Sequence, residues 1–162
     1  MSIKLSATCD VAKSFAVKRE KQADDTETVV AHLKISDVLV DRDQLDELCA
    51  QPIGWSQAAL FDEFGAPLLH ATLELHRVEW RLSGVIRGGD TKASPRLTLK
   101  DADVTALTLE LTKHGALMAC ALSWQAAGDE VDDVADLLGK TCAIECVLTD
   151  GGQGDLLGRR AA

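Results

Sequence analysis

A predicted β-hairpin constrains the fold of this chain more than any other feature. Alternate apolar positions predict two neighbouring strands, and Lys113-His114-Gly115 lies between them. Glycine takes the positive φ that a short hairpin turn requires, because it has no Cβ to clash with the backbone. The apolar faces of the two strands are Leu107, Leu109 and Leu111, then Ala116, Met118, Cys120, Leu122 and Trp124. This hairpin predicts an antiparallel sheet.

The same alternation of apolar and polar residues recurs along most of the chain. It predicts further strands within residues 2–17, 28–40, 69–75, 78–87 and 142–148. The apolar phase slips by one residue between Leu75 and Val78, which predicts a β-bulge at His76-Arg77. Residues 18–25 are polar and unpatterned, so we expect an exposed loop there.

Two short acidic helices are predicted near residues 41–50 and 129–138. Asp41 is followed three residues later by Gln44, which has the form of a capping box. Acidic residues crowd the first turn of the second helix, where the helix dipole favours them, and Gly139 is placed to end it. The fold expected is mainly β, with seven to nine strands in an antiparallel β-sandwich or strongly curved sheet. Residues 1–150 form one domain in this prediction, and residues 151–162 form a flexible tail.

Composition excludes several classes of function. The net charge of −9 argues against wide, non-specific contact with nucleic-acid phosphates. No secretory signal and no apolar run of the ~18 residues that a membrane helix needs is present, so the expected location is the cytoplasm. The five cysteines mostly follow the apolar phase, which favours buried thiols over a disulfide framework.

Catalytic and metal motifs are missing from the sequence. It has no Gly-rich phosphate loop, no nucleophile elbow and no His-Glu-x-x-His pattern. Cys142 and Cys146 are four residues apart on a predicted strand, about 13 Å, which is too far to share a zinc ion. We therefore predict no catalytic residue, no cofactor and no metal site.

Segment 51–67 is the candidate site for a protein partner, because it combines aromatic rings with acidic neighbours. One interpretation is a lid whose rings cover the core. The other is an exposed anchor, since rigid rings bury much area in an interface at low entropic cost. The partner-binding residues in the second interpretation are Trp55, Phe61, Phe64, Asp62, Glu63, Asp43, Asp46 and Glu47.

An acidic surface of this kind is attracted electrostatically to basic proteins, such as host or phage proteins that handle nucleic acid. We expect binding of such a protein, including an inhibitory or anti-defence role. A homodimer is also expected, through an exposed strand edge or through the aromatic segment.

The alternative function is binding of single-stranded nucleic acid in phage recombination or replication. A basic strip of Arg77, Arg81, Arg87 and Lys92 would contact phosphates in this interpretation. The same arginines could equally form ordinary cross-strand ion pairs on the outer face of a sheet. Trp80 shares its phase with core residues, so we expect its ring to be unavailable for base stacking.

Three parts of the sequence carry a resemblance to a known group of proteins. These are Pro52-Ile53-Gly54-Trp55, the segment Val78–Gly89, and Leu122-Ser123-Trp124 leading into Gly128–Asp133. The chain resembles small accessory proteins of tailed phages and prophages, which are often encoded near recombination genes. The resemblance implies a phage setting and a binding role, and it supplies no catalytic residues.

Overall fold

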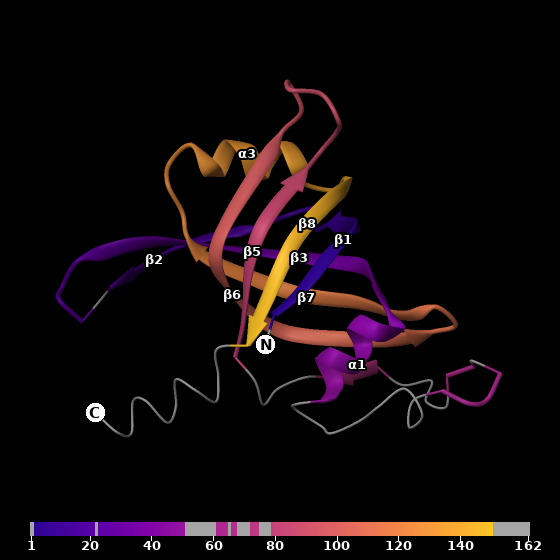
Figure 1. Cartoon of the computed structure of the whole chain (residues 1–162). Coiled ribbons are helices and arrows are strands. Elements are labelled where there is room, and N and C mark those ends of the chain that lie inside the picture. The colour runs from indigo at the N-terminus through magenta and orange to yellow at the C-terminus, as the bar shows by residue number, and fades with distance from the viewer. Residues whose placement is uncertain are drawn as a thin grey trace.

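The computed structural model describes residues 2–21, 23–50, 61–64, 66–67, 72–74 and 79–150 (Figure 1). The described part is mainly β, as predicted. Its strands are β1 (Ser2–Val11), β2 (Ala16–Lys21), β3 (Glu27–Asp41), β4 (Thr72–Glu74), β5 (Trp80–Arg87), β6 (Arg96–Thr112), β7 (Gly115–Gln125) and β8 (Thr141–Asp150). Its helices are α1 (Arg42–Ala50) and α3 (Glu130–Leu137), close to the predicted ranges.

Six of the strands close into an antiparallel barrel in the order β1-β8-β5-β6-β7-β3. The barrel closes where β1 pairs with β3, at Asp10 opposite Ser36 and Val11 opposite Ile35. β2 and β4 lie outside this ring, paired with β3 and β6. The expectation of a β-sandwich was therefore wrong, because β1 and β3, the two ends of this run of six strands, pair with each other and no second sheet faces them in the described part.

Three β-bulges help to bend the long strands around the barrel. In each, two residues of one strand oppose a single residue of its neighbour. Asp37, Asp101 and Ala106 lie in these bulges with φ of 55°, 54° and 51°. A bulge bends its strand and increases the local twist, which favours closure over a flat sheet. The bulge predicted at His76-Arg77 lies outside the described residues.

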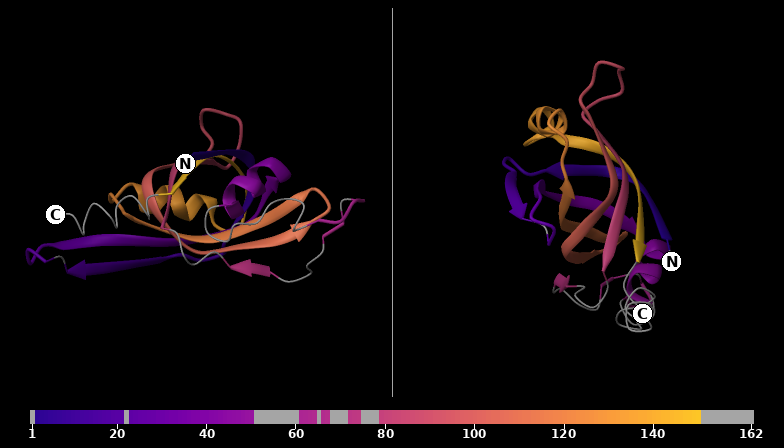
Figure 2. Two further views of the ribbon diagram at one scale, coloured as in Figure 1. Left: turned by 60° about the horizontal axis from the view of Figure 1, so that its bottom comes forward. Right: turned by 90° about the vertical axis from the view of Figure 1, so that its left-hand side faces the viewer.

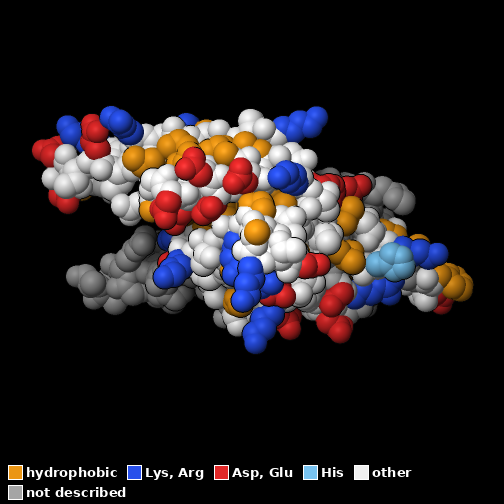
Figure 3. Space-filling model, turned by 90° about the horizontal axis from the view of Figure 1, so that it is seen from above, with side chains coloured by type: hydrophobic (Ala, Val, Ile, Leu, Met, Phe, Trp, Pro, Cys, Tyr) orange, Lys and Arg blue, Asp and Glu red, His pale blue; other side chains and the backbone are white. Residues whose placement is uncertain are grey.

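β2 and the first part of β3 form a ribbon that projects beyond the barrel (Figures 1 and 2). β2 pairs along its length with β3, from Ala16 opposite His32 to Lys21 opposite Glu27. The ribbon is the upper left lobe in Figure 3, with acidic and basic side chains at its tip. The prediction of a loop from residue 18 was wrong for Lys18–Lys21, because β3 supplies hydrogen-bond partners that the local pattern does not reveal.

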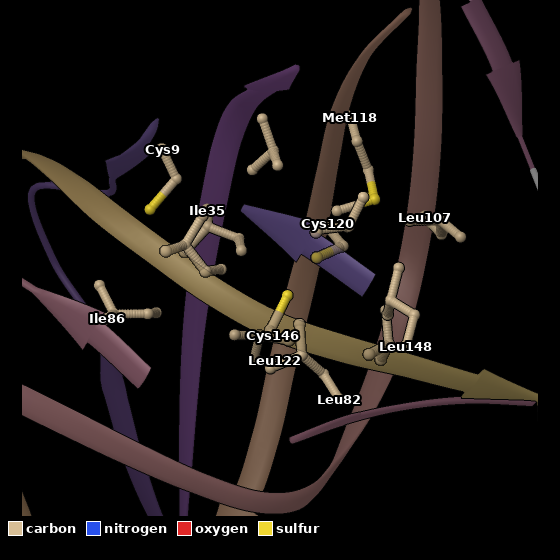
Figure 4. Packing of buried hydrophobic residues seen from close by; sticks show 14 of the residues in the cluster. Cys9, Ile35, Leu82, Ile86, Leu107, Met118, Cys120, Leu122, Cys146 and Leu148 are labelled. Atoms are coloured by element: carbon tan, nitrogen blue, oxygen red, sulfur yellow. The ribbon is translucent and has the colours of Figure 1, made fainter. Parts of the chain in front are cut away.

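Hydrophobic side chains from every barrel strand fill the interior, and Figure 4 shows several of them converging. Among the described residues, no polar or charged side chain is buried with them. The helices lie at opposite ends of the barrel (Figure 1), where Leu45 and Leu48 of α1 and Val134 and Leu137 of α3 are fully buried. Functional groups in the described part must therefore act from the outside of the barrel.

Candidate functional site

The described part of the predicted partner-binding segment is a compact loop. Phe61 and Pro67 form an isolated β-bridge, and the Asp62 N–H donates to the Ala66 carbonyl at 2.9 Å. Oδ1 of Asp62 accepts hydrogen bonds from the N–H groups of Phe64 and Ala66, at 2.9 and 2.8 Å. An aspartate that bonds the backbone ahead of it stabilises a turn. Asp62 therefore organises the loop.

The two phenylalanines of this loop have opposite environments. Phe61 is 6% exposed and belongs to the hydrophobic core, whereas Phe64 is 83% exposed. Among the described residues, the other large hydrophobic side chains that are exposed are Val17 and Leu39, at 43% and 48%. Phe61 thus covers the core, as the lid interpretation expects, and Phe64 is exposed, as the anchor interpretation requires. Binding of a partner by Phe64 stays a prediction. Trp55 lies outside the described residues.

Arg42, at the start of α1, connects the loop to the barrel. Its guanidinium carbon lies 4.7 Å from the centroid of the Phe61 ring, a cation–π contact. Its Nη2 donates to the carbonyl of Lys113 in the β6–β7 turn, at 2.7 Å. The loop, α1 and this turn lie at the same end of the molecule (Figures 1 and 2). Phe64 is therefore presented from a position that is tied to two elements of the fold.

The predicted acidic residues of the site occupy the same end of the molecule. Asp43 and Glu47 of α1 are exposed, and Asp46 is half-buried. Asp62 and Glu63 are exposed in the loop, although Asp62 is engaged by the backbone. The acidic character that the sequence indicated is thus present at the same end of the molecule as Phe64, together with the cationic Arg42.

The structure places the predicted basic residues in a less favourable arrangement for nucleic acid. Arg81 pairs with Asp103 directly opposite on β6, at 2.6 Å. Arg87 pairs with Glu145 of β8, at 3.2 Å. Lys92 is exposed in the β5–β6 connection, and Arg77 lies outside the described residues. Acidic side chains on neighbouring strands thus offset the charges of Arg81 and Arg87. Both arginines form the cross-strand ion pairs that were the other interpretation of this strip.

A polar cleft of about 700 Å³ lies beside Arg81 on the outside of the barrel, lined also by Lys100, Asp103, Trp124 and Glu130. Nε1 of Trp124 donates to Oε2 of Glu130 at 2.9 Å, and the indole is buried. Trp80 is buried as well, as predicted. Neither ring offers an open face for base stacking, which single-strand binding normally uses.

Two carboxyl groups meet where β1 and β3 close the barrel. Thr141 Oγ1 donates to Asp10 Oδ1 at 2.7 Å, and this hydrogen bond lowers the pKa of Asp10. A hydrogen bond between the carboxyl groups of Asp10 and Asp37 raises the pKa of Asp37, with burial and the Asp10 charge contributing. Ile35 and Val38 are both apolar and three positions apart, a break in the alternation that could have indicated the bulge at Asp37, but nothing in the sequence pairs Asp37 with Asp10.

The described thiols are unsuited to nucleophilic chemistry. Burial raises the pKa of Cys9, Cys120 and Cys146 to about 12, so that they stay protonated at neutral pH. Cys142 is also buried, opposite Cys9 on the neighbouring strand. Within the described ranges, no group of three or more histidine, cysteine or acidic side chains could hold a metal ion.

Comparison with known proteins adds no relative. Models of known protein families, curated proteins and solved structures were searched, and none of them matches this chain. No helix in the described part of the chain is long and apolar enough to cross a membrane.

Proposed function

We propose that this chain is a non-catalytic interaction protein, and that the Phe64 loop (residues 61–67) binds a protein partner with a basic surface. The observation that carries the proposal is the 83% exposure of Phe64 on a loop whose backbone is held by Asp62. A large exposed ring costs solvation free energy in the free protein, and burying it in a partner recovers that energy. A host or phage protein that handles nucleic acid in the cytoplasm fits this description, and binding would inhibit it.

The contacts that anchor the described part of the loop support this function. Phe61 is packed into the core beneath the Arg42 guanidinium, and Arg42 is itself bonded to the β6–β7 turn. A ring presented from an ordered loop loses little conformational entropy on binding, so more of its burial energy appears as affinity. Phe64 therefore has the properties of an interface anchor.

The electrostatic surroundings favour a basic partner. Glu63 is exposed next to Phe64 in the chain, Glu47 is exposed on α1 at the same end of the molecule, and the whole chain carries a net charge of −9. Long-range attraction between an acidic protein and a basic surface mainly raises the rate of association, and salt screens it. Binding is therefore expected to combine an apolar anchor at Phe64 with salt-sensitive steering.

Affinity capture from a bacterial lysate tests the proposal with two matched variants. Phe64→Ala removes the ring, and Leu39→Ala removes an exposed hydrophobic side chain of the β3 barrel wall. We expect wild type and Leu39→Ala to capture the same basic proteins, with capture falling as salt increases. Phe64→Ala is expected to lose them. Equal capture of basic proteins by wild type and both variants would overturn the proposal. Capture of nucleic acid from a lysate that has not been treated with nuclease would also overturn it.

We also propose that the chain forms a homodimer, and that Phe64 contributes to it. Phe64 is the most exposed large hydrophobic side chain among the described residues, and a two-fold contact would bury two such rings. Light scattering at tens of micromolar should report a dimer for wild type and a larger monomer fraction for Phe64→Ala. A strict monomer for wild type would contradict this proposal and would leave the binding of a basic partner untouched.

A further inference from the structure

We propose that the free edge of β2 accepts an extended, acidic segment of a protein partner as an added β-strand. β2 hydrogen-bonds to β3 along one edge, and no strand of the described chain pairs with its other edge. All six residues of β2 are exposed. The β2–β3 ribbon projects from the barrel on the side away from the Phe64 loop (Figures 1 and 2), so this surface is separate from the one proposed above.

The direction of the backbone groups identifies which residues of β2 are available. The Ala126 N–H donates to the Val29 carbonyl at 2.9 Å, so Val29 directs its backbone groups toward β7 and away from β2. Arg19 is the partner of Val29 in the β2–β3 ladder. In an antiparallel pair of this kind, the opposite residue directs its own N–H and C=O away from the ladder. Arg19 therefore presents both groups to the free edge.

The residues two positions away from Arg19 have the same backbone orientation, because the direction of N–H and C=O groups alternates along a strand. Val17 and Lys21 are two residues from Arg19, so they also direct their N–H and C=O groups outward. Lys18 and Glu20 direct theirs toward β3. An incoming strand would therefore bond to Val17, Arg19 and Lys21 without disturbing the existing ladder.

The side chains of β2 favour an acidic strand. Lys18, Arg19 and Lys21 are three cations among six residues, against one acid, Glu20. Lys21 also forms an exposed ion pair with Asp25 at 3.3 Å, so a glutamate of the added strand would compete with Asp25 for it. Opposite charges on directly opposed residues stabilise a pair of strands, and like charges destabilise it. Val17 is 43% exposed and can cover an apolar side chain of the added strand. An extended segment with glutamates opposite the cations and an apolar residue opposite Val17 matches this edge.

A second copy of β2 is a poorer occupant of the same edge. Only every second residue of β2 directs its N–H and C=O groups outward. In a two-fold symmetric antiparallel pair of β2 strands these residues must face each other, so the two-fold axis passes through a residue and not between two residues. The registers centred on Lys18, Arg19 and Glu20 each place an identical charge opposite itself. Lysine-rich edges of this type also discourage self-association in natural sheets. The charge pattern therefore selects a heterologous acidic strand.

Amide hydrogen exchange by NMR tests the proposal on the full chain. The probe is the synthetic peptide acetyl-Thr-Glu-Thr-Glu-Glu-Val-Thr-amide, and the control peptide carries lysine at each glutamate. At saturating acidic peptide, exchange of the Val17, Arg19 and Lys21 amides is expected to slow about tenfold, because these N–H groups gain partners. The Lys18 and Glu20 amides, which already bond to β3, are expected to change little, and the lysine peptide is expected to have no effect.

Two variants separate edge pairing from general attraction. Arg19→Pro removes an outward N–H while leaving the β2–β3 bonds intact, and it is expected to abolish the slowing at Val17 and Lys21. Arg19→Glu keeps the backbone donor and reverses the charge, so it is expected to weaken binding of the acidic peptide about threefold to tenfold. Equal binding of both peptides, binding unaffected by both variants, or concentration-dependent protection of these amides without peptide would overturn the proposal.

Discussion

Asp41 and Gln44 bond to each other reciprocally at the start of α1. The Asp41 N–H donates to Oε1 of Gln44 at 3.0 Å, and the Gln44 N–H donates to Oδ1 of Asp41 at 2.8 Å. Nε2 of Gln44 also donates to the Lys4 carbonyl of β1, at 2.7 Å. A local capping box thus uses the side-chain amide of Gln44 to hold α1 against β1.

Replacing Gln44 should destabilise the protein through both of these functions. Gln44→Ala leaves the Asp41 N–H and the Lys4 carbonyl without their partners, and we expect a loss of about 1–2 kcal/mol in the free energy of unfolding. Urea denaturation followed by circular dichroism measures it. Glu47→Ala is the control, because Glu47 is exposed on the same helix. Equal stability of the two variants would contradict the assigned function of Gln44.

The two phenylalanines of the loop should differ sharply in their effect on stability. Phe61→Ala removes a buried ring and is expected to cost about 3–5 kcal/mol, as for other core phenylalanines. Phe64→Ala removes an exposed ring and is expected to change the free energy of unfolding by less than about 0.5 kcal/mol. Chemical denaturation of the two variants checks this. Similar losses for both would show that Phe64 also packs against the protein.

Gly115, at the start of β7 after the turn from β6, should not tolerate a side chain. Its φ is 141°, and a Cβ at this position would lie 2.1 Å from the Val40 carbonyl oxygen. Gly115→Ala is therefore expected to cost more than about 2 kcal/mol, because backbone atoms must move. Gly128→Ala is the matched control, since no atom lies within 4 Å of its added Cβ. Thermal unfolding should separate the variants, and an unchanged Gly115→Ala would refute the predicted clash.

The carboxyl pair at the barrel closure predicts a pH-dependent stability. Because the pKa of Asp37 is raised, its stabilising contribution is present at low pH and is lost as the pH rises through that pKa. The lowered pKa of Asp10 acts in the opposite direction, since its contribution is lost as the pH falls. Asp37→Asn keeps a donor toward Asp10 and removes one negative charge. We expect this variant to be more stable than wild type at pH 7, with the difference shrinking in acid.

Urea unfolding of Asp37→Asn at several pH values measures this effect. Asp101→Asn is the control, because Asp101 also lies in a bulge at positive φ and asparagine tolerates that conformation. Any general gain from asparagine at positive φ should therefore appear in both variants, without the pH dependence. A gain at pH 7 that is the same in both variants would show that the Asp10–Asp37 contact does not control stability.

The sequence was most informative where a structure is made by neighbours in the chain. The hairpin turn at Gly115, the inward faces of β6 and β7, and the capping box of Asp41 and Gln44 were all predictable. Each depends on the period of a strand or on contacts between residues a few positions apart. The burial of Trp80 followed from its phase for the same reason.

The candidate site was predictable in composition but not in arrangement. Phe61 and Phe64 are three residues apart and chemically identical, yet one is in the core and the other is exposed. The difference depends on Arg42 and the Lys113 carbonyl, which are distant in sequence from the loop. Arg81 and Arg87 likewise resemble a basic strip in the sequence, but in the structure they pair with Asp103 and Glu145 of the neighbouring strands.

By itself the sequence determined a mainly antiparallel β protein with two short acidic helices, the first of them with a capping box, because hydrophobic periodicity and capping are local properties. Only the tertiary structure decided that the strands close into a barrel and that β2 is left with a free edge. Closure requires β1 to reach β3 at Asp10 and Ser36, and it depends on how the bulges at Asp37, Asp101 and Ala106 bend the strands. The bending of each strand adds to that of its neighbours across the whole sheet, so closure of the barrel cannot be predicted from any single segment of the sequence.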